Sequence, residues 1–377
     1  MRLEVVDLAY GGEGVARTPE GVVFIPGAFP GEVVEATLTV RKKRFARAHL
    51  DALLTASPYR IRPETPVVPG MPYAELAYTA EVAAKQHQLE ALLTRIGRLP
   101  VGDFLLAPVP APLTAHYRNK LVLHWDGRTL GYVGEDNHTL VDTPHCPLSQ
   151  GAINEALTQL RANPAPLRKL RSGARVFFRY TPHDGTHIGF GAPPTGSLTE
   201  QIAGLTLSVA ADAFFQVNPA ATELLLNDFR NALAGTRRVV DLYCGCGLFG
   251  LVATQAGATD LFGLEVTPSA IASAKVNARR LGVTADYRCA PAETLSDALP
   301  PADCWILDPP RDGLSEALRA ALMRHLPPRI AYISCGPDTL ARDLRDLTPH
   351  YVIERMRLFD FFPRTAHFET LTLLHRR

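Results

Sequence analysis

The sequence is short of net charge, of cysteine and of long apolar runs. Its formal net charge is +1 over 377 residues, so any binding of nucleic acid must come from local basic patches. No segment approaches the roughly twenty consecutive apolar residues of a membrane helix, and residues 1–10 lack the apolar stretch of a signal peptide. These absences predict a cytoplasmic protein with no membrane partner.

The cysteines are few and scattered. Six in a chain of this length argue against a disulfide scaffold and favour reduced thiols with individual roles. Cys244 and Cys246 form a Cys-x-Cys in a glycine-rich turn without adjacent metal ligands, so we interpret them as small residues of a tight turn. We interpret Cys289 and Cys304 as core residues, and we expect no bound metal.

The most informative segment is Val239 to Gly250. An apolar run stops at the pattern Gly245-x-Gly247-x-x-Gly250 and passes into a second apolar stretch, which is the strand, turn and helix of a nucleotide-type cofactor site. About twenty residues on, another apolar strand ends at Glu265, an acid suited to binding ribose hydroxyls. NAD and S-adenosylmethionine both fit this pattern. Asp241 favours S-adenosylmethionine, because a carboxylate before the loop repels a pyrophosphate and attracts the ammonium of a methionine moiety.

The N-terminal segment, residues 1–57, contains short apolar strands separated by glycine turns. This pattern predicts an oligonucleotide-binding type of β-barrel. A dense basic run, Arg41 to Arg47, follows the third strand and includes Phe45. Such a run can hold phosphates and stack on a base. The alternative is a solvated hairpin edge, where lysines and arginines prevent pairing with another strand.

The middle segment, residues 58–200, begins with a proline-rich connector. The apolar spacing of Tyr78–Leu99 predicts an amphipathic helix, and Tyr117–Trp125 is the first of several expected strands. We predict a small α+β domain that covers one side of the catalytic domain. Arg118 and Lys120 occupy alternate positions of one expected strand, so both should point to the same face. There they either contact RNA or are solvated surface charges.

In the last segment, residues 201–377, strands and helices alternate. The alternation predicts a parallel doubly wound sheet with ligands at the carboxyl ends of its strands. Asp308, in Asp308-Pro-Pro-Arg311, and Cys335 each follow such a strand. The cysteine points to carbon methylation of a pyrimidine, because C5 becomes nucleophilic when a thiolate adds at C6. The thiolate needs positive or hydrogen-bonding neighbours, and Arg311 is the candidate.

Several ordered motifs together resemble those of the RNA uracil-C5 methyltransferases. The resemblance is carried by Tyr117-Arg-Asn-Lys, Phe214-Phe-Gln-Val-Asn, Asp241-Leu-Tyr-Cys-Gly-Cys-Gly, Asp308-Pro-Pro-Arg-Asp-Gly, Ser334-Cys-Gly-Pro-Asp and Phe359-Asp-Phe-Phe-Pro-Arg-Thr-Ala-His-Phe-Glu-Thr. The N-terminal segment similarly resembles the TRAM domain of RNA-modifying enzymes. The resemblance implies an α/β fold, with a Rossmann-like class I methyltransferase domain, an N-terminal OB-type barrel and a small α+β central domain.

The resemblance also implies roles for individual residues. Cys335 is the expected nucleophile, and Glu369 is the base that removes the C5 proton. Leu248 stands where many members have asparagine, so this chain lacks one expected cofactor contact. Cytosine-C5 enzymes carry a further cysteine in the Asp-x-Pro turn, which is absent here and favours uracil. The expected S-adenosylmethionine site comprises Gln216, Tyr243, Glu265 and Asp308.

The expected partner is RNA, and we expect a monomer. TRAM-bearing relatives mostly modify 23S ribosomal RNA, so that RNA is the predicted substrate and transfer RNA is the alternative. A non-catalytic RNA-binding protein on a methyltransferase fold is the rival from another class. Some ribosomal members hold a four-iron cluster on cysteines, but the matching positions here are approximately Thr65, Met71 and Ala74, and only Cys146 remains. We therefore expect no iron–sulfur cluster.

Overall fold

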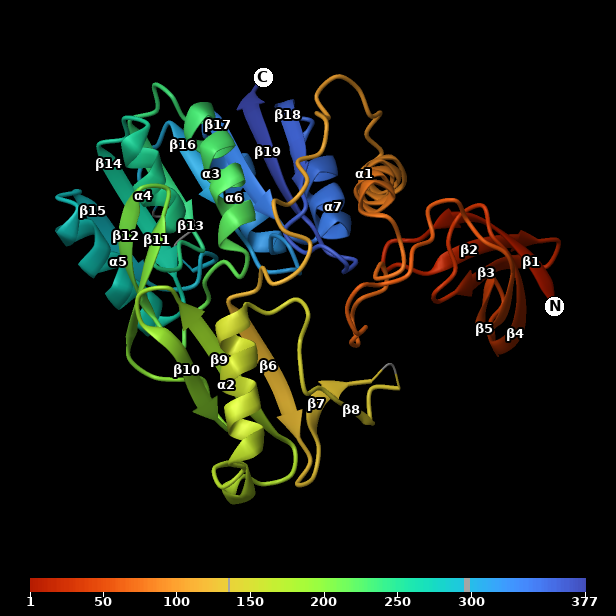
Figure 1. Ribbon diagram of the computed structural model, residues 1–377. Coiled ribbons are helices and arrows are strands. Elements are labelled where there is room, and N and C mark those ends of the chain that lie inside the picture. Colours follow the sequence, from red (N-terminus) through yellow and green to blue (C-terminus); the bar gives the residue numbers. More distant parts are fainter. Residues whose placement is uncertain (135, 295–298) are drawn as a thin grey trace.

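The computed structural model describes residues 1–134, 136–294 and 299–377. Figure 1 shows a barrel at one side, a small sheet with a helix below, and a larger α/β unit that contains the chain's C-terminus. Within the described ranges, no helix combines the length and apolarity needed to cross a membrane. This arrangement agrees with the predicted fold class.

The N-terminal part is a closed five-stranded barrel with the order β1-β2-β3-β5-β4. Alternate side chains of its strands, such as Val5, Ile25 and Val34, fill the interior. The basic run forms the turn between the last two strands, and Phe45 begins the second of these. The strands are β1 (Arg2–Leu8), β2 (Gly14–Thr18), β3 (Gly21–Ile25), β4 (Val33–Arg41) and β5 (Phe45–Thr55).

The central part is a five-stranded antiparallel sheet with the order β10-β9-β6-β7-β8, and α2 (Gly151–Ala162) packs on β9 and β10. Arg118 lies outside the first strand, which begins only at Lys120, so the prediction that both belong to one strand is wrong. A short 3-10 helix, η1 (Leu167–Lys169), follows α2. The strands are β6 (Lys120–Trp125), β7 (Leu130–Val133), β8 (Leu140–Asp142), β9 (Ala174–Thr181) and β10 (Gly185–Phe190).

The catalytic part contains a seven-stranded sheet with the order β15-β14-β13-β16-β17-β19-β18. Its first five strands are parallel, as predicted, but the last two run antiparallel to their neighbours. No helix joins β18 to β19, and a connection without a crossover suits an antiparallel pair. The strands are β13 (Arg238–Leu242), β14 (Asp260–Glu265), β15 (Ala285–Cys289), β16 (Cys304–Leu307), β17 (Arg329–Ser334), β18 (Tyr351–Phe359) and β19 (Glu369–Arg376).

Both faces of this sheet are buried. Val239 of β13 belongs to the apolar cluster on one face, whereas its neighbour Val240 belongs to the cluster on the other. Such double burial explains why the parallel strands are almost continuously apolar in sequence. The helices of this part are α3 (Pro219–Ala232), α4 (Leu248–Gln255), α5 (Pro268–Arg280), α6 (Glu316–His325) and α7 (Pro337–Leu347).

Residues before the predicted boundary at residue 200 also belong to the catalytic part. The helix α1 (Tyr78–Arg95), from the segment 58–200, packs on α7 and lies between the barrel and the catalytic sheet (Figure 1). The hairpin of β11 (Ser197–Ile202) and β12 (Leu205–Ala210) packs on α5. The division drawn at residue 200 thus falls within β11.

Candidate active site

The backbone of the glycine loop after β13 has a conformation that lets a ligand approach it closely. Tyr243, Gly245 and Gly247 have φ angles of 66°, 53° and 88°, in the left-handed region that favours glycine. A Cβ on Gly247 would lie 2.6 Å from the Tyr287 hydroxyl, whereas a Cβ on Gly245 would meet nothing within 4 Å. Gly247 is therefore packed against the protein, and Gly245 faces open space where a cofactor can lie.

Asp241 contacts the first turn of α4, directly after the glycine loop. Its side chain is fully buried, and its Oδ2 accepts a hydrogen bond of 2.9 Å from the Gly250 amide. Its Oδ1 has no partner among the residues that the structure describes, and burial raises its pKa to about 8. One oxygen of Asp241 thus fixes the loop, and the attraction of a ligand's ammonium by this carboxyl group stays a prediction.

Glu265, at the end of β14, lies beside the glycine loop. Its carboxylate accepts hydrogen bonds from the amides of Gly245, at 3.3 Å, and Thr267, at 2.8 Å. The acid is therefore fixed at the edge of the loop, with lone pairs remaining for hydroxyl donors. This is the position predicted for an acid that binds a ribose.

The other predicted cofactor residues lie on neighbouring segments. Asp308 follows β16, and burial together with the Glu265 carboxylate raises its pKa to about 7. Tyr243 donates a hydrogen bond of 3.1 Å to Glu293. Gln216 is buried just before α3, where Asn218 caps the helix and also donates to the Phe361 carbonyl.

These residues fit S-adenosylmethionine. The loop offers space above Gly245, and Asp308 receives no side-chain hydrogen bond from any part of the chain that the structure describes. Carboxylates without a cationic partner suit a cofactor that carries a sulfonium and several N–H and O–H donors. Tyr243, Gln216, Glu265 and Asp308 are the residues that would hold it.

The register of β17 and β19 brings Cys335 toward Glu369. Ser334, the last residue of β17, pairs with Thr370, whose hydroxyl donates to the Ser334 carbonyl at 3.2 Å. Cys335 and Glu369 therefore each adjoin the last residue pair of this ladder. Cys335 is half-buried and Glu369 is buried. The two predicted catalytic residues thus lie together at the carboxyl edge of the sheet.

The site raises the pKa of both groups. Burial, then the carboxylates of Glu369 and Asp308, raise the pKa of the Cys335 thiol to about 12, and Arg311 opposes them. Burial and Asp308 also raise the pKa of Glu369 well above its usual range. The expected dominance of a positive neighbour is wrong for the protein alone, because burial and then two carboxylates outweigh the effect of the exposed Arg311 on the Cys335 pKa.

The loops that carry Asp308 and Cys335 are pinned together. A Cβ on Gly336 would lie 2.6 Å from the Arg311 carbonyl oxygen, so only glycine permits this approach. The Thr339 hydroxyl donates to the same carbonyl at 2.8 Å. The Asp308-Pro-Pro-Arg turn is therefore held against the N-terminus of α7, directly after the cysteine.

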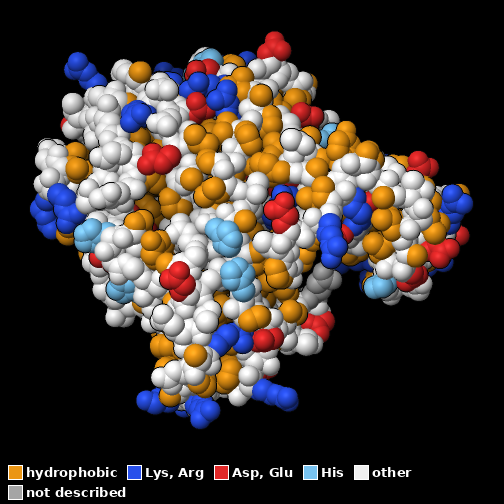
Figure 2. All heavy atoms as spheres, in the orientation of Figure 1, with side chains coloured by type: hydrophobic (Ala, Val, Ile, Leu, Met, Phe, Trp, Pro, Cys, Tyr) orange, Lys and Arg blue, Asp and Glu red, His pale blue; other side chains and the backbone are white. Residues whose placement is uncertain are grey.

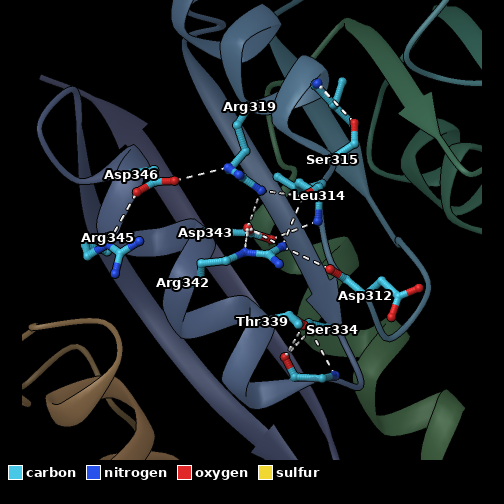
Figure 3. Close-up of polar contacts among 12 residues, drawn as sticks. Asp312, Leu314, Ser315, Arg319, Ser334, Thr339, Arg342, Asp343, Arg345 and Asp346 are labelled. Carbon is cyan, nitrogen blue, oxygen red and sulfur yellow. Dashed lines mark hydrogen bonds and ion pairs between the residues drawn. The ribbon is translucent and has the colours of Figure 1, made fainter.

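A buried carboxylate on α7 fixes the continuation of this turn (Figure 3). Asp343 accepts hydrogen bonds from the Leu314 amide, at 2.8 Å, and from the Tyr332 hydroxyl, at 2.7 Å. It also pairs with Arg319 at 3.2 Å and with Arg342 at 2.8 Å. Both ends of the segment between Asp308 and α6 are thus anchored.

A second buried network holds the loop between β18 and β19. Lys85 of α1 is fully buried, and its ammonium lies 2.7 Å from both Glu81 and Asp360 and 3.2 Å from the Phe362 carbonyl. Glu81 in turn accepts a hydrogen bond of 2.7 Å from the Arg364 amide. Sequence reasoning missed this network, although the spacing of Glu81 and Lys85 on a helix hinted at an ion pair.

The structure also shows the surroundings of the other cysteines. Cys304 is buried, as predicted, but Cys289 is exposed because it ends the edge strand β15. Cys244 and Cys246, in the glycine turn, are also buried. Over residues 1–134, 136–294 and 299–377, no group of side chains is placed to hold a metal ion. Met71 and Ala74, which replace two expected cluster ligands, pack with Cys146 in one apolar cluster.

Comparison with known families matches three regions. The profile of the tRNA (uracil-5-)-methyltransferases matches residues 301–377, that of the TRAM domain matches residues 1–50, and that of the ribosomal protein L11 methyltransferases matches residues 213–303. An uncharacterized RNA methyltransferase of Thermosynechococcus vestitus is 31% identical, over 99% of this chain and 97% of its own. Another, from Halalkalibacterium halodurans, is 30% identical, over 99% and 95%.

A solved structure has the same fold along the whole chain. The tRNA (uracil-54, C5)-methyltransferase of Pyrococcus abyssi, in complex with S-adenosyl-L-homocysteine, superimposes with a TM-score of 0.80 and 22% identity. The match covers 99% of this chain and 100% of that one. With the glycine loop, the barrel and these relatives together, the chain belongs to the TRAM-bearing RNA uracil-5-methyltransferases, which are S-adenosylmethionine-dependent enzymes.

Proposed function

We propose that this enzyme methylates C5 of a uridine in 23S ribosomal RNA through a covalent bond between Cys335 and C6. The observation that carries the proposal is the proximity of Cys335, which directly follows β17, to Glu369, which begins the neighbouring strand β19, with Asp308 near both. The TRAM barrel supports ribosomal RNA as the substrate. Transfer RNA is the second candidate, because the solved Pyrococcus abyssi enzyme acts on it.

In the proposed reaction, the Cys335 thiolate forms a bond to C6 and pushes electron density onto C5. S-adenosylmethionine, when bound, would supply the methyl group to C5 and a positive charge that lowers the raised pKa of both Cys335 and Glu369, so that both groups react as anions. The Glu369 carboxylate then takes the C5 proton. The electrons of that C–H bond restore the C5–C6 double bond, and the Cys335 thiolate leaves.

The roles of Cys335 and Glu369 predict two different failures. Cys335→Ala should neither methylate RNA nor crosslink to it. Glu369→Gln should transfer one methyl group and stall as a covalent adduct, visible as a protein–RNA band that resists denaturation. Normal turnover by Glu369→Gln without an adduct would assign proton removal to another group.

The substrate is tested by mapping 5-methyluridine in RNA from cells that lack the protein. We expect one or more positions of 23S ribosomal RNA to lose the methyl group, and wild-type protein but not Cys335→Ala to restore it. Loss confined to transfer RNA would contradict the ribosomal assignment and support the second candidate. Unchanged modification of both RNAs would contradict the proposed function.

The apolar packing around Cys146 predicts an enzyme that works without iron. Met71, Ala74 and Cys146 share one apolar cluster, and the Tyr132 hydroxyl lies 3.3 Å from the Cys146 sulfur. One thiolate does not retain a four-iron cluster. We expect colourless protein after anaerobic purification, with full activity in the presence of an iron chelator. Stoichiometric iron and sulfide in such material would contradict this expectation.

A further inference from the structure

The barrel contacts the catalytic part through the turn between β1 and β2. Gln88 of α1 donates hydrogen bonds to the carbonyls of Leu8, at 3.2 Å, and Ala9, at 3.0 Å. Gly12 lies so close to Pro72 that a Cβ would come within 2.5 Å of it. The turn is therefore fixed on α1 and the connector, and it carries Tyr10.

The side chain of Tyr10 reaches the start of β19. Its ring packs edge-on against Phe368, with 6.1 Å between ring centroids and an interplanar angle of 73°. Phe368 immediately precedes Glu369. The charged groups that act on the Tyr10 hydroxyl are Asp338, Arg311, Cys335 and Glu369, all from the carboxyl edge of the catalytic sheet. A residue of the RNA-binding barrel thus lies beside the predicted nucleophile and base.

The Tyr10 hydroxyl is a donor without a protein acceptor. Burial raises its pKa to about 12, so the phenol keeps its proton at neutral pH. No hydrogen bond joins this hydroxyl to any residue that the structure describes, and the side chain is only half-buried. The hydroxyl is therefore available to donate a hydrogen bond to an atom of a bound substrate.

Tyr10 also lines a groove between the barrel and α1, with a volume of about 350 Å³. The groove is also lined by Phe24, by the exposed Arg17 and Arg95, and by Asp7. Cations and an aromatic face suit an RNA strand. Tyr10 lines the groove and also contacts Phe368. An RNA strand that runs from the barrel to Cys335 would therefore contact Tyr10.

We propose that Tyr10 is a substrate-contacting residue that the barrel adds to the uridine site, where its hydroxyl donates a hydrogen bond to an oxygen of the target nucleotide. The proposal rests on the proposed function, because it needs a nucleotide between Cys335 and Glu369. The barrel would then both bind RNA and complete the uridine site, because its β1–β2 turn places Tyr10 there. RNA binding and methyl transfer are coupled through this one side chain.

The test uses Tyr10→Phe, which removes only the hydroxyl, and transcripts of 23S ribosomal RNA and transfer RNA made with 5-fluorouridine. Fluorine at C5 cannot be removed as a proton, so the Cys335–C6 adduct persists after methyl transfer. We expect adduct formation to be about tenfold slower, as for the loss of one hydrogen bond. The melting temperature and the Kd for S-adenosylmethionine should not change.

The matched control is Tyr59→Phe, because Tyr59 is 56% exposed in the connector, outside the site. It should form the adduct at the wild-type rate. If Tyr10→Phe also forms it at that rate, the proposed contact is wrong while the covalent reaction stands. If the wild type forms no adduct with either transcript, the covalent reaction itself is wrong.

Discussion

Four carboxyl groups around the carboxyl edge of the sheet fall into two sets. Asp343 and Glu81 have cations or N–H groups at their oxygens. Asp308 and Glu369 receive no side-chain hydrogen bond from any residue that the structure describes, and burial raises the pKa of each. Satisfied buried charges hold a scaffold, whereas unsatisfied ones are retained where a ligand completes them. Asp343 and Glu81 therefore stabilise the structure around the site, whereas Asp308 and Glu369 are available to a cofactor or substrate.

Removing a cation from the satisfied set should lower the free energy of unfolding more than any other change considered. Lys85→Met removes the cation between Glu81 and Asp360, all three side chains being fully buried, and leaves both carboxylates without it. Breaking a buried ion pair in this way typically costs about 3–5 kcal/mol. Urea unfolding should show this loss, and methylation should fail at temperatures where the wild type works.

The matched control for Lys85→Met is Arg238→Met. Arg238 and Asp303 form an ion pair of 2.8 Å, with 52% and 34% of their side chains exposed. An exposed pair contributes roughly 0–1 kcal/mol, so this variant should unfold nearly as the wild type does. Equal losses in the two variants would contradict the view that burial makes the Lys85 network the stronger anchor.

Neutralising the unsatisfied set should instead change the pH dependence of stability. Asp308 has a folded pKa of about 7, above its unfolded value of 3.8, so the folded state binds the extra proton. Its contribution to stability is present below pH 3.8 and is lost as pH rises through 7, at about 1.4 kcal/mol per pKa unit as an upper bound. Asp308→Asn should flatten this fall, which melting temperatures between pH 5 and pH 8 would measure.

Bound S-adenosylmethionine should act on the same dependence. Its positive charge favours the Asp308 carboxylate, so the cofactor should raise the wild-type melting temperature more at pH 8 than at pH 5. In Asp308→Asn this difference should shrink. If the melting temperature of Asp308→Asn depends on pH as that of the wild type does, with and without cofactor, Asp308 is not an acid with a raised pKa.

The sequence pattern identified Asp308, the family resemblance supplied Glu369, and neither revealed the satisfied set. Asp308, Cys335 and the glycine loop each follow an apolar strand, and parallel strands bring their carboxyl ends to one edge. The partners of Asp360 give no such local signal, since Lys85 lies 275 residues earlier in the chain. A buried ion pair depends on which elements pack together, and periodicity does not encode that.

The same limit explains two further errors. The apolar pattern of β19 predicts a strand but not its direction, so the antiparallel insertion of β19 between β17 and β18 had no signature. The pKa of Cys335 depends on Glu369, which only this pairing brings near. The barrel was predictable in contrast, because its strands are short, local in sequence and separated by glycine turns.

The smallest expected effect concerns the barrel's basic turn, which is far less constrained than either set of carboxylates. Lys42, Lys43 and Arg44 are exposed, and across the described chain no ion pair involves them. Arg41 beside them already pairs with Glu20 at 2.8 Å. If the three free cations contact phosphates, changing all of them to Ala should lower the slope of log K against log salt by about 2.

The matched control removes three positive charges elsewhere. Arg168, Lys169 and Arg171 are exposed beside η1, where Figure 2 shows basic side chains gathered at the outer end of the central sheet. Changing these to Ala should reduce RNA affinity less than the change in the barrel turn, and neither variant should alter the Kd for S-adenosylmethionine. If the salt slope of the barrel variant is unchanged, Lys42, Lys43 and Arg44 form a solvated hairpin edge that prevents strand pairing and do not contact phosphates.

In that case the groove beside Tyr10 would be the main RNA-binding surface of the barrel. The double variant with Arg17→Ala and Arg95→Ala should then lower the salt slope instead.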